Sequence, residues 1–424
     1  MNIVELKKAI TDGALDKDFS ILYQDVTAAR ARYIKACDEF VSIFGDKNEV
    51  FLYSAPGRTE VGGNHTDHQH GRVLAGSVDL DIIGVVAKNN DGIVRIKSEG
   101  FPMDEVSLSA LDIDKSEFGH ASALIRGMCA NFKLNGHNVN GFDAYTTSSV
   151  MKGSGLSSSA AFEVFIGTVM NYLFNDGRVD AVEIAKISQK AESIYFGKPC
   201  GLLDQSASAL GGFTAIDFKD PTKPVVEKVD FDLSSHGYVL CVVNTGGNHA
   251  NLTQDYADIT VECRDVSNYF NKDYLRDVDQ DEFFSNIAGV KEKCGDRAVL
   301  RAIHFFAEDQ RAEDEKQALK NGNFSEFLRL INESGNSSYK YLQNVYSTSA
   351  VNEQGLCLGL ALTEKFLKGR GACRVHGGGF AGTIQCFIPS ELIADYKVMI
   401  EKVFGEGSCY ILKIRPVGGY EIKA

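Results

Sequence analysis

The chain has 424 residues, 44% of them hydrophobic and 24% charged, which is the composition of an ordinary soluble globular protein. This length exceeds what one hydrophobic core usually organises, so we expect two domains. The 57 acidic and 44 basic residues give a net charge of −13. Because binding to a phosphate backbone normally requires a basic surface, this charge excludes nucleic acid as the main partner, while an anionic small ligand remains compatible with it.

The sequence indicates a cytoplasmic protein without a membrane partner. No stretch approaches the roughly 20 apolar residues of a membrane span. The segment Met1–Ser20 mixes acidic and basic residues and has no apolar signal-peptide region. The ten cysteines are scattered, without a C-x-x-C pair or zinc-ribbon spacing. We interpret them as free thiols in a reducing compartment.

Hydrophobic periodicity predicts helices and strands in alternation through the first half of the chain. Apolar residues at helical spacing predict a helix over Ala28–Phe44, with Gly45 as its C-cap. A short strand, Glu49–Ser54, is expected to end at the break that Pro56-Gly57 makes in the pattern. The elements expected next are the strand Gly141–Ser148 and the helices Ser157–Phe174 and Ala181–Phe196.

The second half begins after Lys219–Pro224, which carries two prolines amid charges and is the best candidate for a link between domains. The elements expected beyond it are a buried strand at Gly237–Val243, a helix over Asn248–Tyr269, a charged helical region over Asp265–Gln317, and an alternating strand at Gly382–Ile388 after the glycines Gly377–Gly379. The whole pattern predicts a mixed α and β protein in which antiparallel sheet predominates over regular βαβ units.

The segment Val150–Ala161 has the properties of an anion-binding loop. Gly153 and Gly155 free the backbone to turn its N–H groups toward one point. A helix beginning near Ser157 adds unpaired amides and the positive end of its dipole, and two further serines follow. A serine-capped helix after a glycine turn would have the same features. The spacing is neither that of a Walker A loop nor that of a G-x-S-x-G nucleophile elbow.

A second polar segment, Ala55–Gly71, gathers an arginine, an aspartate and three histidines in a glycine-flanked loop. His65, Asp67, His68 and His70 are spaced so that they could form a metal cluster, as in a metallohydrolase. The same side chains can bind the hydroxyl groups of a polar ligand. The residues alone leave both interpretations open.

A third segment, Lys198–Ser208, holds Asp204 among apolar and small residues, just after a predicted helix that carries Glu192. A lone aspartate in such a position is usually a turn or cap residue. Its interpretation therefore depends on the other segments.

Taken in order, these segments resemble the GHMP superfamily of small-molecule kinases, and the galactokinases most closely within it. The family reads G-R-V-N-L-I-G-E-H-T-D-Y where this chain has Gly57–His68, and P-x-G-x-G-L-S-S-S-A where it has Met151–Ala160. It then reads C-G-x-x-D-Q at Cys200–Gln205 and T-G-G-G-F-G-G at His376–Gly382. The resemblance extends from about Ala28 to the end, and it argues against a metal cluster because the family uses the first loop for sugar.

The resemblance implies an α+β, two-domain GHMP kinase fold. After an extension at 1–27, a ribosomal-protein-S5-domain-2-like α/β domain would span 28–220, and a ferredoxin-like α+β domain would span 221–424. It also implies an ATP-dependent sugar 1-kinase that converts galactose and ATP to galactose 1-phosphate and ADP. We therefore expect ATP, Mg²⁺ and a small sugar as ligands of a monomeric, cytoplasmic enzyme.

Roles for single residues follow from the same resemblance. Asp204 would manage the proton of the acceptor hydroxyl with Arg58 beside it, and a neighbouring arginine keeps a carboxylate ionised. Mg²⁺ would be held by Ser159 and Glu192. The residues implied for ATP are Gly153, Ser154, Gly155, Leu156, Ser157, Ser158 and Ser159, and those for the sugar are Asn64, His65, Asp67, Gly201 and Tyr256. Gly377–Gly379 would support the phosphate loop from the second domain.

The sugar loop departs from the family pattern at four positions. Asn64 stands where galactokinases usually have glutamate, His68 replaces tyrosine, Glu60 replaces asparagine, and Gly62 replaces a branched apolar residue. Without the negative charge at position 64, a 6-carboxylate would no longer be repelled. The run Asp67-His68-Gln69 also resembles galacturonate kinases of the same family, so galacturonate is an alternative substrate to galactose.

A non-catalytic sensor of galactose and ATP is a further alternative. Some galactokinase-like proteins act as sensors and have lost residues from the serine-alanine part of the phosphate loop. Here Ser157–Ala161 is complete, and the predicted catalytic and metal-binding residues are present. These features favour an enzyme.

Overall fold

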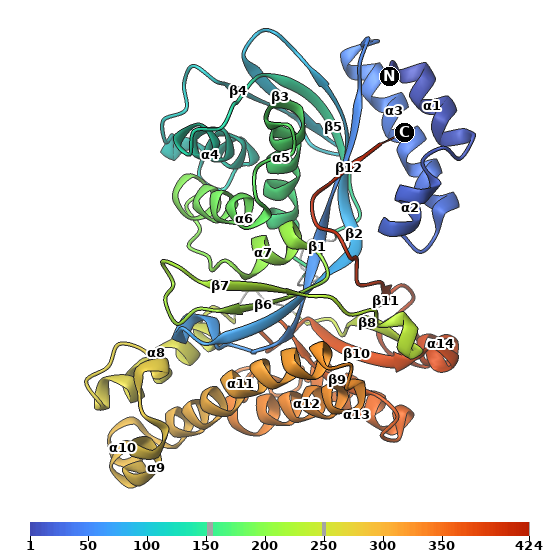
Figure 1. Ribbon diagram of the computed structural model, residues 1–424. Helices are drawn as coiled ribbons and strands as arrows, with labels where there is room; N and C mark the ends of the chain where they lie inside the picture. The colour runs from blue at the N-terminus through green and yellow to red at the C-terminus, as the bar shows by residue number, and fades with distance from the viewer. Residues whose placement is uncertain (151–155, 248–251, 424) are drawn as a thin grey trace.

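The computed structural model describes residues 1–150, 156–247 and 252–423, which form two sheets and their covering helices (Figure 1). The larger sheet has eight strands in the order β12-β1-β2-β5-β3-β4, with β6 paired to β2 and β7 to β6. These strands are β1 (Phe51–Gly62), β2 (Arg72–Lys88), β3 (Ile93–Ser98), β4 (Met103–Ser107), β5 (Phe142–Ser148), β6 (Phe213–Asp217), β7 (Val225–Val229) and β12 (Tyr420–Ile422). The smaller sheet has the order β11-β8-β10-β9, made of β8 (Tyr238–Asn244), β9 (Ala372–His376), β10 (Thr383–Pro389) and β11 (Cys409–Leu412).

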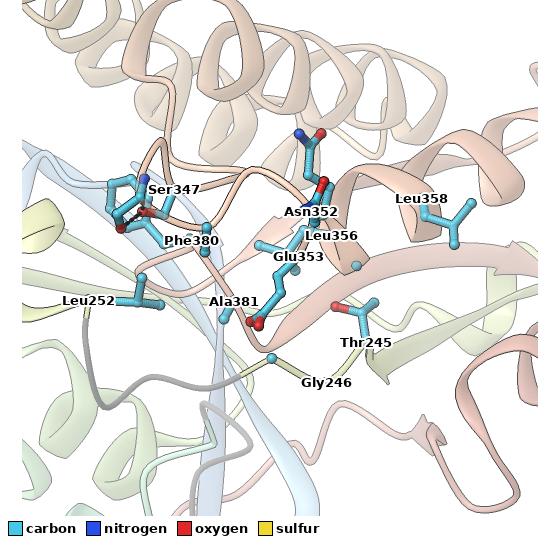
Figure 2. Close-up of a pocket in the computed structure, with 15 residues that line it drawn as sticks. Thr245, Gly246, Leu252, Ser347, Asn352, Glu353, Leu356, Leu358, Phe380 and Ala381 are labelled. Carbon is cyan, nitrogen blue, oxygen red and sulfur yellow. Dashed lines mark hydrogen bonds between the residues drawn. The ribbon is translucent and has the colours of Figure 1, made fainter.

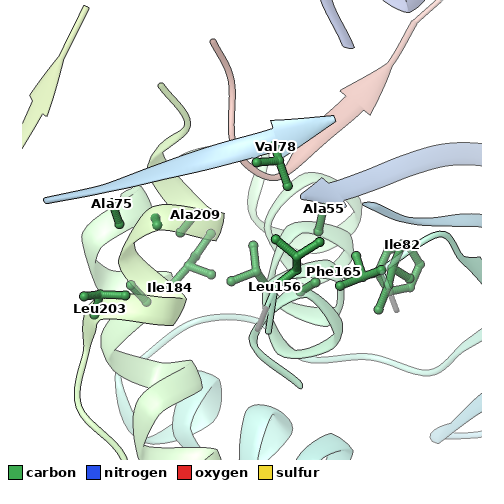
Figure 3. Close-up of a cluster of buried hydrophobic side chains, with 14 of the residues drawn as sticks. Ala55, Ala75, Val78, Ile82, Leu156, Phe165, Ile184, Leu203 and Ala209 are labelled. Atoms are coloured by element: carbon green, nitrogen blue, oxygen red, sulfur yellow. The ribbon is translucent and has the colours of Figure 1, made fainter. Parts of the chain in front are cut away.

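Helices cover both faces of the larger sheet. Side chains alternate along β2, so that Ile82 and Val86 join one core while Ile83 and Val85 join the other. The first face packs on α4 (Ala121–Leu134), α5 (Ser158–Asn175), α6 (Ala181–Lys190) and α7 (Leu203–Leu210), and the second on α1 (Ile3–Thr11), α2 (Asp16–Leu22) and α3 (Val26–Phe44). Figure 3 shows Leu156 and Phe165 packed between the sheet and these helices in the first core. The larger sheet, on which the site is built, is therefore held in place by helices on both of its faces.

The N-terminal extension is an integral part of the second core. Asn2 forms a capping box with Glu5 at the start of α1, and Asp25 caps α3. The hydroxyl of Tyr23 donates to the buried Asp81 of β2 over 2.6 Å, and Arg415, near the other end of the chain, lies 3.3 Å from the same carboxylate. Asp81 thereby joins the extension to the sheet and to the C-terminal segment.

The second layer consists mainly of helices below the larger sheet in Figure 1. They are α8 (Thr253–Tyr269), α9 (Gln280–Ser285), α10 (Ile287–Cys294), α11 (Asp296–Lys320), α12 (Phe324–Ser337), α13 (Gly355–Leu367) and α14 (Ile393–Phe404). The long helix α11 packs against β1 and β2 as well as α8 and α12, so it carries side chains from this layer to the sugar loop. Within the described residues, no helix combines the length and apolar character that a bilayer crossing requires.

Most predicted elements are present with small changes at their ends. The helix predicted over Ala28–Phe44 begins two residues earlier, and its C-cap Gly45 has a φ of +72° as expected. The predicted helix over Asn248–Tyr269 is described from Thr253 onward, since residues 248–251 lie outside the described part. The pairing is antiparallel except between β3 and β5, which agrees with the predicted preference for antiparallel sheet.

Three local predictions were wrong. The strand does not end at Pro56-Gly57, because a register shift between Pro56 and Arg58 accommodates the proline and β1 continues to Gly62. Lys219–Pro224 is not a link between domains but part of the connection between the paired strands β6 and β7. All residues of β10 are buried, whereas the sequence predicted alternating buried and exposed positions. Helices cover one face of this strand, and the core of the larger sheet covers the other.

The chain crosses between the two layers more than once. Both β7 and β12 lie in the larger sheet, although they follow the boundary predicted at residues 220 and 221. The mixed helix and sheet architecture of the predicted α+β class is present. The division at 28–220 and 221–424 stays a prediction.

Candidate active site

The residues that open α5 lie at the centre of the site. Gly153, Ser154 and Gly155 of the predicted phosphate loop lie outside the described residues. The side chain of Leu156 is fully buried in the core, and its carbonyl accepts a hydrogen bond from the Arg58 N–H over 3.0 Å. Ser157 has a φ of +54°, an unusual value for a residue with a side chain, and makes no capping hydrogen bond to α5. The first amides of α5 therefore remain available for an anion.

An ion pair connects this helix start to β1 and α7. Arg58 Nε lies 2.7 Å from Asp204 Oδ1, and the Ser157 hydroxyl donates to Asp204 Oδ2 over 2.6 Å. Burial works to raise the pKa of the Asp204 carboxyl, but the charge of Arg58 and these hydrogen bonds outweigh it and hold the pKa below its usual range. Asp204 is therefore a carboxylate at neutral pH, and its side chain keeps an exposed fraction of 33%.

Beside this ion pair lies a group of oxygen ligands. The Ser159 hydroxyl donates to Glu192 Oε1 over 3.0 Å, and Lys198 Nζ lies 2.9 Å from the same oxygen. Glu192 stands in the π-helical turn η3 (Ala191–Tyr195) that continues α6, which moves its carboxylate out of the regular helical register. A hydroxyl and a carboxylate are hard oxygen donors, so the pair predicted for Mg²⁺ has suitable chemistry and is brought together.

Gln205 and Glu163 complete this group, and the sequence analysis missed both. Gln205 Nε2 donates to Glu192 Oε2 over 2.7 Å and to Glu163 Oε2 over 3.2 Å. Burial and the negative charge of Glu192 raise the pKa of Glu163 well above its usual range. Its spacing of four residues from Ser159 on one helix was a signal that both side chains share a face.

The sugar loop places Asp67 next to Gly201. Asp67 opens the 3-10 turn η1 (Asp67–Gln69), and a Cβ at Gly201 would lie only 3.6 Å from its Oδ2. Burial raises the pKa of Asp67, partly opposed by the charge of His65, while Asp204 acts in the same direction as burial. His65 Nε2 lies 2.8 Å from the carbonyl of Gly378. Predicted sugar residues from two distant segments thus meet near Asp204.

Asn64 is fully engaged inside the protein. Its Nδ2 donates to Glu60 Oε1 and to the Gly377 carbonyl, each over 2.8 Å. Its Oδ1 accepts from Ser338 and Asn344 over 3.2 and 2.9 Å, and the residue has no exposed surface. These four bonds use the whole capacity of a carboxamide. A direct contact between Asn64 and the sugar stays a prediction, and it requires the exchange of one of these partners.

The second glycine-rich segment packs against Tyr256. The Tyr256 hydroxyl donates to the Gly379 carbonyl over 2.8 Å, and a Cβ at Gly378 would lie 2.6 Å from the tyrosine ring. Gly377 and Gly379 have φ values of +70° and +84°, which favour glycine. This conformation and the close contact with Tyr256 therefore require glycines in this segment. Its three carbonyls contact Asn64, His65 and Tyr256 in turn.

Two large cavities flank these residues. One of about 730 Å³ begins at Ser158 and Phe162 of α5 and extends between Phe101, Thr146 and Phe196. The other, of about 740 Å³, lies in the second layer between Thr245, Ser347, Glu353 and the loop at Phe380 and Ala381 (Figure 2). The first combines aromatic walls with a helix N-terminus, which suits a nucleotide whose phosphates reach α5.

The histidines of the sugar loop are not arranged around a common point. His70 stacks on Tyr274 with ring centroids 3.5 Å apart, while the rings of His65 and His68 meet edge to face at 5.7 Å. In residues 1–150, 156–247 and 252–423, no group of three or more histidine, cysteine, aspartate or glutamate side chains is placed to hold a metal ion.

The chain is similar to known proteins in both sequence and structure. The family described as "GHMP kinases N terminal domain" matches residues 122–212, and the "Galactokinase galactose-binding signature" matches residues 38–88. A galactokinase of Clostridium tetani is 29% identical over 392 residues, which cover 91% of this chain and 96% of the relative. The crystal structure of Lactococcus lactis galactokinase complexed with galactose superimposes with a TM-score of 0.73 at 25% identity, covering 90% of this chain and 98% of that one.

This chain carries the N-terminal domain of GHMP kinases and a galactokinase galactose-binding signature, and it is similar to galactokinases over most of its length. The kinase shares its two-domain α+β fold with the mevalonate kinase of Methanococcus jannaschii, at a TM-score of 0.62 and 14% identity, with 87% of this chain and 99% of that one covered. It is a sugar kinase, a phosphotransferase with an alcohol group as acceptor, and ATP is the substrate that GHMP kinases share. The two matched regions contain Arg58, Asp67, Glu192 and Asp204.

Proposed function

We propose that this kinase transfers the γ-phosphoryl group of ATP to the anomeric hydroxyl of galactose and releases galactose 1-phosphate and ADP. The contact of Arg58 and Ser157 with one carboxylate, that of Asp204, carries the proposal. It joins the strand that leads into the sugar loop, the start of the phosphate-binding helix and α7 at a single point. An acceptor hydroxyl next to Asp204 would lie between the predicted sugar residues and the N-terminus of α5.

The reaction needs alignment, charge neutralisation and a destination for one proton. As the bond from the sugar oxygen to the γ-phosphorus forms, the bond from that phosphorus to the bridging oxygen of ADP breaks. The proton of the sugar hydroxyl passes to Asp204, whose ionised carboxylate also orients the hydroxyl. Because Arg58 holds its pKa low, Asp204 is a weak base, and its orienting role precedes the proton transfer. Arg58 stabilises negative charge on the transferred group.

Mg²⁺ would bind at Ser159 and Glu192, which already share a hydrogen bond. When bound, it neutralises charge on the phosphates of ATP. Lys198 contacts the same Glu192 oxygen. The charge of Glu192 helps to raise the pKa of Lys198 although burial works in the opposite direction, so Lys198 supplies a cation at this position. Gln205 orients the carboxylate from its other oxygen.

The nucleoside would occupy the cavity of about 730 Å³ next to Ser158. Phe101, Phe162 and Phe196 offer ring faces and edges to a base, and hydroxyls of Ser98, Thr146 and Ser148 line the same space. These residues were not predicted from the sequence, since they come from β3, β5, α5 and the loops between elements.

Galacturonate is the second candidate acceptor. The galactose-binding signature over residues 38–88 and the relatives named galactokinase support galactose. Position 64, usually glutamate in galactokinases, is a neutral asparagine whose oxygen and nitrogen are held by other protein groups. A 6-carboxylate would thus meet no negative charge from this side chain.

A coupled assay of ADP release with ATP, Mg²⁺ and a panel of free sugars tests the proposal. We expect turnover with galactose and phosphate found on the anomeric oxygen of the product by ³¹P and ¹³C NMR. Higher kcat/KM with galacturonate would replace galactose by the second candidate. Binding of galactose and ATP without turnover on any hexose, uronic acid or amino sugar would identify a sensor and overturn the kinase proposal.

A further inference from the structure

A third large cavity, of about 710 Å³, continues outward from the sugar loop. Asp67 and Gly201, two residues predicted to bind the sugar, form part of its wall. From there it extends between α6, α8 and the connection of β6 with β7, reaching Arg264 of α8 and Lys186 of α6. An acceptor with its anomeric hydroxyl at Asp204 and its ring at Asp67 would therefore have open space beyond the ring.

The cations of this cavity have no ion-pair partner among the described residues. Of the arginines in the described part of the chain, Arg264 is the one whose guanidinium has no carboxylate within 4.0 Å. Lys186 and Lys190 also line the cavity, and neither is among the residues that form ion pairs within 1–150, 156–247 and 252–423. Of the cavity's carboxylates, Glu183 is already bound by His137 over 2.8 Å.

This concentration of positive charge is specific to the third cavity. The other two large cavities have carboxylates on their walls, Glu353 in one and Glu99 with Asp104 in the other, and no lysine or arginine among their described lining residues. The protein as a whole carries a net charge of −13. In this acidic protein, two lysines of α6 and Arg264 of α8, none of them ion-paired among the described residues, form a local site for an anion.

His68 also lines the cavity, next to Asp67 in the sequence, at the position where galactokinases usually have tyrosine. Its buried Nε2 has no hydrogen-bond partner among the described residues. Burial lowers the pKa of His68 to about 3, and the charges of His65, His304 and Arg264 add to this effect, so the ring is neutral and Arg264 acts on it from nearby. The substitution replaces a phenol by a smaller ring at the junction between the sugar residues and the cations.

We infer that this cavity extends the sugar site and binds a carboxylate carried by the acceptor, with Arg264 as the main contact and Lys186 and Lys190 at the rim. The inference rests on the proposed function and specifies its substrate class. The preferred acceptor is an acidic sugar with a free anomeric hydroxyl, either a uronic acid or a galactose that carries a uronic acid on the side of the ring away from C1, and galactose itself is the neutral acceptor of the same site. Guanidinium and carboxylate form charge-assisted, bidentate hydrogen bonds, which gives Arg264 the larger share of recognition.

The test compares kcat/KM for matched acidic and neutral acceptors at low salt. The pairs are galacturonate with galactose, and glucuronosyl-(1→3)-galactose with galactosyl-(1→3)-galactose. We expect the acidic member of at least one pair to be preferred by about tenfold, the effect of a hydrogen bond to a charged group. The pair that shows the preference distinguishes a uronic acid from a larger acidic sugar, and 0.5 M NaCl reduces the preference by screening.

Arg264→Gln is expected to lower the ratio of acidic to neutral kcat/KM about tenfold, through KM. Lys272→Gln removes an exposed lysine outside the cavity and serves as the control that keeps the ratio. An equal ratio of acidic to neutral kcat/KM in the wild type and in Arg264→Gln would overturn the inference. The proposed function would stand in that case, provided that galactose is turned over. Absence of turnover on every sugar would overturn the proposed function instead. Calorimetric binding of the same sugars without ATP would then still decide whether Arg264 selects the acid.

Discussion

Arg58 Nε and Asp204 Oδ1 lie 2.7 Å apart, although 146 positions separate the two residues in the sequence. Arg58 is fixed by β1 and by the hydrogen bond from its N–H to the Leu156 carbonyl, while Asp204 stands in the first turn of α7. Because the core shown in Figure 3 holds Leu156 and both elements, the ion pair is preorganised before any ligand binds.

Replacing Asp204 by asparagine is expected to remove most of the turnover and leave nucleotide binding. The amide keeps the shape of the carboxyl group but cannot take a proton, and it removes the negative charge that Arg58 pairs with at this position. Loss of a positioned general base typically lowers kcat by about 10² to 10⁴-fold. Steady-state kinetics measure kcat, and calorimetry measures the Kd of ATP. Undiminished kcat would show that the proton leaves by another route.

Removing the Ser157 hydroxyl is expected to shift the pH dependence of kcat/KM. This hydroxyl donates to the ionised form of Asp204, so the pKa of Asp204 rises in Ser157→Ala. The acid limb of the profile then moves to higher pH, by less than about one unit because the carboxylate is partly hydrated. Ser158→Ala is the control at the next position. A limb that moves to lower pH would contradict the assignment.

The cavity next to Ser158 is tested by Phe101→Ala. Phe101 has an exposed fraction of 48%, and stacking of a base on an aromatic ring is worth about 1–3 kcal/mol in nucleic acid complexes. We expect the KM of ATP to rise about 5- to 160-fold, with kcat at saturating ATP changed little. Phe284→Ala, on the distant helix α9, removes a ring with a similar exposed fraction of 43% and is expected to leave KM unchanged.

As pH falls, this protein is expected to lose stability at a higher pH than protonation of its carboxylates alone would cause. Burial lowers the pKa of His304 to about 4 and that of His376 to about 3, from an ordinary value of 6.5. A base with a depressed pKa binds its proton more readily in the unfolded chain, so stability falls as pH drops below 6.5. Each such histidine contributes a slope of up to about 1.4 kcal/mol per pH unit.

Glu308 adds to this loss at lower pH. Burial works to raise its pKa, but His304 and the nearby arginines lower it to about 2 from 4.5, so its stabilising contribution is complete above 4.5 and is lost as pH falls toward 2. Urea unfolding at pH 7.5, 6.5, 5.5 and 4.5 measures both effects. His304→Gln is expected to make the dependence between pH 6.5 and 4.5 shallower, and equal stability of the wild type at pH 7.5 and 5 would contradict the argument.

Local elements were predictable because short-range patterns determine them. The amphipathic helix over Ala28–Phe44 and the start of α5 follow from spacing and capping. The meeting of Arg58 with Asp204, in contrast, came from family resemblance and not from periodicity, since no local pattern reports contacts across 146 positions. The break expected at Pro56 failed for a related reason, because the neighbouring strand and Ser208, whose hydroxyl donates to the Pro56 carbonyl over 2.6 Å, hold β1 together.

The departures of the sugar loop from its family have structural partners that the sequence could not reveal. Glu60 pairs with the buried Arg374 over 3.0 Å, and Asn64 bonds to Ser338 and Asn344. The N–H groups of Gly63 and Asn64 donate to Glu308 of α11. Substitutions in the loop are therefore matched by polar groups on the second layer, more than 240 positions away in the sequence.

Gly62 gives the clearest test of this matching, because galactokinases usually have a branched apolar residue there. A Cβ at Gly62 would overlap Oε2 of Glu315, a buried residue of α11 whose pKa is raised well above its usual range by burial and by the charge of Glu308. Neither carboxyl oxygen of Glu315 has a hydrogen-bond partner among the described residues. The buried carboxyl group thus fills the space that a leucine side chain would need.

Gly62→Leu is therefore expected to destabilise the fold by about 1–3 kcal/mol through overpacking. In the double variant with Glu315→Ala the leucine gains room, and we expect a coupling free energy of at least about 1 kcal/mol in the stabilising direction. Urea unfolding measures both quantities. Glu313→Ala removes a carboxylate from the outer side of the same helix and is expected to give no rescue. Additive effects of Gly62→Leu and Glu315→Ala would show that Glu315 does not occupy the space of the family's apolar side chain. The sugar loop and α11 would then be complementary in charge and not in side-chain volume.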